Sequence, residues 1–164
     1  NKNIIMAAEQ CAPLTTKRVI VIPTKTIPQG IAAAMAFNPD LSVEENEENM
    51  NDAVGEIVSG AVTYAIRETH FNGIEIKEGD LIGLMDNDIA AVSGSVNETV
   101  AALIEKMIEK RDIEDPIVNL YFGDNVEEEE ANELAETLQD RFENAEFIVA
   151  RGGQPLYYYY LSVE

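Results

Sequence analysis

A short apolar run that leads into a polar turn and a helix start constrains this chain more than any other feature. Residues 19–22 are four consecutive β-branched residues, a run short enough to be a strand buried on both faces. Pro23 ends the run, and Pro28 stands where the first turn of a helix tolerates a missing N–H. This order predicts a strand, a turn and a helix over residues 18–37. In α/β proteins, ligands and partners bind at such strand ends.

The charge balance argues against whole classes of function. The chain has 31 acidic and 11 basic residues and a formal net charge of −20, whereas nucleic acids and anionic membranes both attract clustered Lys and Arg. No apolar run approaches the roughly 20 residues that span a bilayer, and a single Cys11 fits a reducing cytoplasm. We therefore expect a cytoplasmic protein with no nucleic-acid partner and no membrane insertion. The charge serves either solubility or steering toward a basic partner, with acidic faces at 44–48 and 127–130.

Hydrophobic periodicity predicts an α/β protein of two small lobes, residues 1–60 and 61–164. In the first lobe, helices over 3–12 and 29–37 flank the strand at 19–22, and a third helix begins at Ser42, which opens a capping box. Because the chain starts with Asn1 rather than Met, we expect it to be a piece of a longer protein whose first lobe continues upstream.

The second lobe is predicted to open with short strands and then to alternate helices with strands. Asn72-Gly73 and the residues 86–88 are turn signals between the short strands. Helices start at Ser95 and at Asp124 or Asn125, and they alternate with strands at 117–122, 146–150 and 156–163. This succession predicts a mixed, mostly parallel sheet with flanking helices in each lobe.

No complete catalytic set is evident in the sequence. One His and one Cys stand far apart, so no metal site is predicted, and neither a phosphate-binding loop nor a nucleophile elbow occurs. His70 is expected to be a solvent-facing turn residue. The best polar candidates are Thr24, Lys25, Thr26 and Gln29, which gather donors beside a helix N-terminus that favours anions. Ordinary capping of the turn and helix is the alternative explanation for the same four residues, and it is the commoner role of such residues.

Four consecutive tyrosines at 157–160 are the second candidate for recognition. On a strand, their rings alternate between the two faces. Either aromatic cross-strand pairs pin this strand in the sheet, or the outward rings, Tyr158 and Tyr160, form a recognition surface, because Tyr is enriched in interface hot spots.

Several motifs together resemble one known family. They are NKNI with AAEQ at the start, VIPTKTIPQG, SGAVTYAIRET at 59–69, GIEI at 73–76, and the ending GGQPLYYYYLSVE. Over essentially its whole length, the chain resembles the C-terminal region of the ATP-binding subunit of bacterial fatty acid kinase, in the dihydroxyacetone-kinase-like family. This resemblance implies that the parent protein is an ATP-dependent kinase, a phosphotransferase of lipid metabolism. It also implies that ATP and magnesium are held by an N-terminal domain outside this sequence, and that the full-length parent can form a homodimer.

The order of elements also resembles the DegV-like acyl-binding proteins, which are the expected partner family. In those proteins the last turn carries a His that helps to hold the acyl carboxylate, whereas here the turn reads GGQP at 152–155. The resemblance therefore implies a DegV-like fold that has lost its lipid-binding chemistry and has no cofactor of its own.

We accordingly expect a non-catalytic domain that docks a DegV-like fatty acid carrier, so that the kinase domain can phosphorylate the acyl carboxylate. The expected contact residues are Thr24, Lys25, Thr26, Gln29, Gln154, Tyr158 and Tyr160. The alternative is a lipid-binding module that holds an acyl chain between its lobes, which requires an apolar tunnel with a few polar groups.

Overall fold

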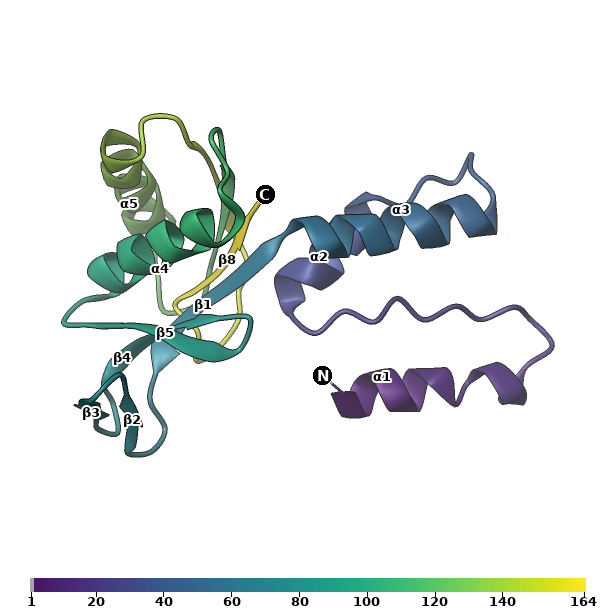
Figure 1. The fold of residues 1–164 in the computed structure, drawn as a ribbon, viewed down its shortest axis with the longest axis horizontal. Coiled ribbons are helices and arrows are strands. Elements are labelled where there is room, and N and C mark those ends of the chain that lie inside the picture. The colour runs from purple at the N-terminus through teal and green to yellow at the C-terminus, as the bar shows by residue number, and fades with distance from the viewer. Residues whose placement is uncertain (1) are drawn as a thin grey trace. The chain divides into compact units, whose positions relative to one another are not determined.

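The chain folds into two compact units, residues 1–57 and 58–164 (Figure 1). The structure is a computed structural model that describes residues 2–164. The division falls where the helix α3 (Val43–Glu56) runs through Ile57 into the strand β1 (Val58–Tyr64).

Within residues 2–57, the first unit takes all its regular structure from helices. α1 spans Lys2–Glu9, a short 3-10 helix η1 spans Ala12–Leu14, α2 spans Ile27–Met35, and α3 packs against α2. The capping box predicted at Ser42 is confirmed: its Oγ accepts the Glu45 N–H at 3.2 Å, and the Glu45 carboxylate accepts the Ser42 N–H at 2.8 Å.

The strand predicted at residues 19–22 is wrong. These residues belong to no strand, and no described residue of the first unit takes part in a β-ladder. A strand exists only where a second strand accepts and donates its backbone hydrogen bonds. The apolar run does predict which residues are shielded from solvent, because Ile20, Val21 and Ile22 are half-buried. It does not predict whether a second strand lies beside it. Within its described residues, the first unit is therefore helical rather than α/β.

The second unit is built on a six-stranded sheet in the order β5-β4-β1-β8-β6-β7. The strands other than β1 are β4 (Leu81–Met85), β5 (Asp88–Ser93), β6 (Ile117–Phe122), β7 (Glu146–Arg151) and β8 (Tyr159–Val163). Only β6 and β7 run parallel, and the other neighbours in this sheet pair antiparallel. The sheet is therefore mixed as predicted, but it is mostly antiparallel rather than mostly parallel. The reason is that the last strand returns between β1 and β6 and runs against both.

Two helices, α4 (Val96–Arg111) and α5 (Glu128–Arg141), pack against one face of this sheet (Figure 1). α4 contacts β1, β4, β5 and β8, and α5 contacts β6 and β7. Their apolar sides meet inward-facing residues of the strands in a single core. The fully buried members of this core with the largest side chains are Tyr159, Leu103, Ile104, Met107, Leu120, Leu138 and Leu161.

The N-terminus of α5 differs from its prediction. Glu127, not Asp124 or Asn125, is the N-cap, and it forms a capping box with Glu130. Asp124 and Asn125 instead belong to the turn that follows β6. Ser95 caps α4 as predicted, since its Oγ accepts the Glu98 N–H at 3.2 Å.

The two predicted turn signals both join neighbouring strands. Asn72 and Gly73 have positive φ angles of 49° and 81° and connect the short strands β2 (Thr69–Phe71) and β3 (Ile74–Ile76). Asp86 and Asn87 do the same between β4 and β5, with φ of 49° and 76°. Two consecutive residues with left-handed backbone conformation match the twist of a hairpin, and Asn, Asp and Gly adopt this conformation most readily.

Candidate partner-binding surfaces

Thr24, Lys25, Thr26 and Gln29 lie together at the start of α2, in the first unit. Thr26 is the N-cap, and its Oγ1 accepts the Gln29 N–H at 3.3 Å. The Gln29 side chain folds back, and its Oε1 accepts the Lys25 N–H at 2.8 Å. Two of the four predicted residues therefore serve helix capping. Lys25 is exposed and Thr24 is half-buried.

Gln154 lies in the second unit, in a turn that closes over the ends of β6 and β7. Its Nε2 donates to the Tyr121 carbonyl at 2.8 Å, and its own carbonyl accepts the Asp124 N–H at 3.1 Å. The N–H groups of Gly152 and Gly153 both donate to the Phe122 carbonyl, at 2.9 and 3.1 Å. Hydrogen bonds of the Gly-Gly turn therefore join the loop after β7 to the end of β6. The Gln154 side chain contributes one of these hydrogen bonds.

The tyrosine run splits between the two faces of the sheet, although only part of it is a strand. β8 begins at Tyr159 rather than at residue 156, and Leu156 has a φ of 71° that interrupts extended backbone before it. Tyr159 is buried on the helix side. Tyr160 is half-buried on the opposite face, where its ring stacks on Tyr157 with centroids 4.8 Å apart. Tyr158 is also half-buried, and it packs against the core instead of joining Tyr160.

Burial raises the pKa of the hydroxyl groups of three tyrosines in this region. It raises the pKa of Tyr159 to about 12, and the nearby Glu130 carboxylate acts in the same direction. Burial also raises the pKa of Tyr160, with an added contribution from Tyr157, and that of Tyr121, which a hydrogen bond to Ser162 partly offsets. All three hydroxyls therefore stay protonated near neutral pH and can donate hydrogen bonds.

Two further tyrosines, Tyr121 and Tyr157, lie beside Tyr160 on the same face of the sheet, and neither was predicted as a contact residue. Tyr160 lies directly opposite Tyr121 on β6 and opposite Ala61 on β1. The aromatic surface of the second unit is therefore Tyr121, Tyr157 and Tyr160, with Gln154 at its edge. Tyr157 was visible in the sequence as part of the run, but the pairing that brings Tyr121 beside Tyr160 was not.

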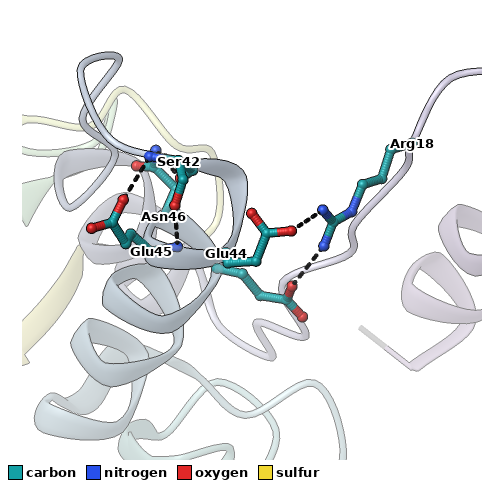
Figure 2. Close-up of polar contacts among 6 residues, drawn as sticks. Arg18, Ser42, Glu44, Glu45 and Asn46 are labelled. Carbon is teal, nitrogen blue, oxygen red and sulfur yellow. Dashed lines mark hydrogen bonds and ion pairs between the residues drawn. The ribbon is translucent and has the colours of Figure 1, made fainter.

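Acidic residues at the start of α3 form a separate polar cluster in the first unit (Figure 2). The Arg18 guanidinium makes ion pairs with Glu44 and, at 3.9 Å, with Glu47. The hydrogen bond and the opposite charge raise the pKa of Arg18 and lower that of Glu44. Both partners are exposed, and exposed pairs contribute little to stability. Residues 26–57 contain no Lys or Arg, so this part of the unit is strongly acidic.

Asn46 is the buried polar residue of this region. Its Oδ1 accepts the Asn38 N–H at 2.7 Å, and its Nδ2 donates to carbonyls of Asn38, Leu41 and Ser42. It therefore fixes the loop between α2 and α3. Beside it, Ile20, Ile22, Phe37 and Leu41 help to line an apolar groove of about 390 Å³, and Phe37 is 54% exposed.

Residues 2–164 contain no cluster of three or more His, Cys, Asp or Glu placed to hold a metal ion. No helix in that range combines the length and apolar composition needed to cross a membrane. His70 is exposed on β2, opposite Glu75, and so lies on a short strand rather than in the turn predicted for it.

The fold is that of the DegV-like proteins. A DegV family protein from Corynebacterium glutamicum superposes with a TM-score of 0.62 over 96% of this chain and 68% of that one, at 17% sequence identity.

Sequence comparison gives a second, independent likeness. The chain is 41% identical over all 164 residues to protein YloV of Bacillus subtilis, and 36% identical to an uncharacterized protein of Staphylococcus aureus strain USA300. It spans 29% of the length of each of these relatives. The model of the FakA-like C-terminal family, which describes the C-terminal part of proteins like the A-type subunit of fatty acid kinase, matches residues 1–164. The chain therefore belongs to the FakA-like C-terminal family of fatty acid kinase.

Proposed function

We propose that this chain is a docking domain that binds a DegV-like fatty acid carrier. In this proposal a kinase domain elsewhere in the parent protein holds ATP and magnesium and phosphorylates the acyl carboxylate, while this chain holds the carrier in place. The observation that carries the proposal is the family match over the whole chain. A kinase-family domain that supplies no nucleotide-binding motif of its own is suited to recognition of the substrate.

Two surfaces are the proposed points of contact. The first is the exposed Lys25 with Thr24, Thr26 and Gln29 at the start of α2. The second is the aromatic surface of Tyr121, Tyr157 and Tyr160, with Gln154 at its edge. Tyr158, also an expected contact residue, is half-buried and packs against the core. Stacked tyrosines bury large area at low cost in side-chain entropy, as hot-spot residues do.

A calorimetric titration with a purified DegV-like carrier, loaded with fatty acid and unloaded, tests the proposal. We expect saturable binding, and a difference between the two forms would show that the domain senses the cargo. The double substitution Tyr157→Ala with Tyr160→Ala should weaken binding about tenfold or more, because it removes a stacked aromatic pair. Ile74→Ala, which removes a 52% exposed apolar side chain from the β2–β3 hairpin, is the control. No heat of binding at high micromolar carrier contradicts the proposal.

The apolar groove beside Asn46 favours a second function, direct binding of a fatty acid. Its lining is mostly aliphatic and aromatic, as in sites for acyl chains. Native mass spectrometry of the purified protein would then reveal a bound acyl chain, and Phe37→Ser should remove it. A protein that remains free of lipid after incubation with oleate leaves docking as the better account.

A further inference from the structure

The strand β7 forms one edge of the six-stranded sheet, so one side of its backbone has no neighbouring strand. The Glu146 N–H donates to the Pro116 carbonyl at 2.9 Å, which shows that the backbone groups of residue 146 point toward β6. Because these groups alternate in direction along a strand, the N–H and C=O groups of Phe147, Val149 and Arg151 point to the open side. They have no backbone hydrogen-bond partner among residues 2–164.

This open stretch of backbone is bounded at both ends. Before it, the N–H and the carbonyl of Ala145 are both hydrogen-bonded inside the unit, the carbonyl to Gln139 Nε2 at 2.9 Å. After it, the Gly153 N–H donates to the last carbonyl of β6 at 3.1 Å. The open groups therefore belong to residues 147–151, and Val149 lies at the midpoint.

The opposite edge of the sheet is protected, whereas β7 is not. On β5, the Ala90 carbonyl accepts Lys106 Nζ, and the pairing with β4 shifts register between Gly83 and Leu84. Lysines and bulges of this kind keep sheet edges from pairing with other chains. β7 contains neither Lys nor Pro, and its register with β6 is regular along its whole length. The β7 edge is thus able to accept a further strand.

The helix above this edge presents a side that is poor in charge. Gln139 marks that side of α5, because its hydrogen bond to Ala145 holds it beside the start of β7. Residues 128, 132, 135 and 139 form one stripe at helical spacing, and only Glu128 among them is acidic. A second copy, which carries the same charge of −20, therefore meets little repulsion along this stripe.

We propose that two copies of this chain pair antiparallel through β7, about a two-fold axis at Val149. In this register Val149 pairs with its own copy and Phe147 pairs with Arg151 of the other, so every open N–H and C=O has a partner. On the face away from the helices, Ile148, which is 44% exposed, lies beside the half-buried Ala150 of the other copy, a large side chain against a small one. On the helix side, the Arg151 guanidinium lies beside the Phe147 ring, and aromatic rings attract cations.

Sedimentation equilibrium of the purified chain, from micromolar to millimolar concentration, tests the proposal. We expect a monomer–dimer equilibrium. Ile148→Lys should weaken dimerisation about tenfold or more, because it places a charge on the pairing edge. Ile117→Lys is the matched control: Ile117 is 37% exposed on β6, one strand in from the edge and on the same face as Ile148.

Amide hydrogen exchange locates the interface residue by residue. At concentrations that favour the dimer, the amides of Phe147, Val149 and Arg151 should exchange more slowly than in dilute solution. The amides of Ile148 and Ala150 point toward β6 and should not change. Added NaCl should strengthen the dimer, because it screens the repulsion between two copies of like charge.

The outcomes decide the proposal without reference to carrier docking, since the chain is measured alone. Weakening by Ile148→Lys but not by Ile117→Lys, with protection at alternate residues of β7, supports it. A chain that stays monomeric at millimolar concentration in high salt overturns it, as does equal weakening by both variants or protection confined to other segments.

Discussion

Gly123 marks the tightest backbone contact near the aromatic surface. A Cβ at this position would lie 2.1 Å from the Tyr157 carbonyl oxygen and 2.7 Å from that of Gln154, both of them backbone atoms. The Gly123 N–H also donates to the Tyr158 carbonyl at 2.8 Å, so the turn cannot easily move away. We expect Gly123→Ala to reduce the free energy of unfolding by about 3 kcal/mol, measured by urea denaturation.

Gly94→Ala is the matched control for that substitution. A Cβ there would meet only the tip of Glu98 at 3.8 Å, an ordinary contact, and the position needs no positive φ. Its unfolding free energy should stay within about 0.5 kcal/mol of the unaltered chain. Equal stability of the two variants would mean that the turn over β6 is looser than its geometry indicates.

Tyr159 should make stability fall at high pH. Its pKa is about 12 in the folded chain, against about 10 when exposed in the unfolded one. The unfolded chain therefore releases this proton first, so the contribution is fully present below pH 10 and is lost as pH rises toward 12. Between pH 9 and 11.5, Tyr159→Phe should lose less unfolding free energy than the unaltered chain, in urea titrations at each pH. Parallel losses in the two proteins would show that Tyr159 ionises normally.

At the scale of an element, α3 depends on its first turn. The capping box between Ser42 and Glu45 satisfies N–H groups that the helix itself leaves open. Ser42→Ala should destabilise α3 by about 1 kcal/mol, seen as faster amide hydrogen exchange along the helix. Ser42→Asp keeps an acceptor oxygen at the cap and should restore the slow exchange. If the Ala variant exchanges at the original rate, packing against α2 rather than the cap holds α3.

The elements also show which parts of the fold the sequence could predict. Ser42, Ser95 and the Asn72-Gly73 turn were predictable because caps and hairpin turns are local chemistry. Residues 19–22 are all β-branched and residues 58–64 contain only three β-branched side chains, yet only the second stretch is a strand, since it lies between β4 and β8. Strand direction is likewise a property of distant pairs, which explains why a mostly parallel sheet was predicted.

In the candidate surfaces too, residues with a local role were predictable, whereas residues brought together by distant pairing were not. Thr26 and Gln29 were identifiable because their role is a local cap. Tyr121 was missed because only the register between β6 and β8 brings it beside Tyr160. Glu130 was visible in the sequence only as part of an acidic run, and its place near Tyr159, whose pKa it helps to raise, depends on how α5 packs against the sheet.

At the scale of the whole molecule, the charge of −20 should govern how fast a basic partner arrives. Electrostatic steering raises association rates and is screened by salt. We expect the association rate with the DegV-like carrier to fall about tenfold between 50 and 500 mM NaCl in stopped-flow measurements, with a smaller change in dissociation rate. A rate that does not depend on salt would assign the charge to solubility instead.

The two units should differ sharply in their ability to fold alone. Among residues 2–164, every buried apolar residue except Pro28, Ala33 and Ile57 lies in the second unit, and both apolar core clusters lie wholly within it. A domain of this size with one continuous core is of the kind that folds independently. Expressed alone, residues 58–164 should unfold cooperatively and keep the NMR shifts they have in the full chain. Residues 1–57, whose helices share little buried surface, should give the poorly dispersed spectrum of an unfolded chain. A cooperative transition from residues 1–57 would show that α2 and α3 form a sufficient core by themselves, to which the Ser42 cap and the hydrogen bonds of the buried Asn46 contribute.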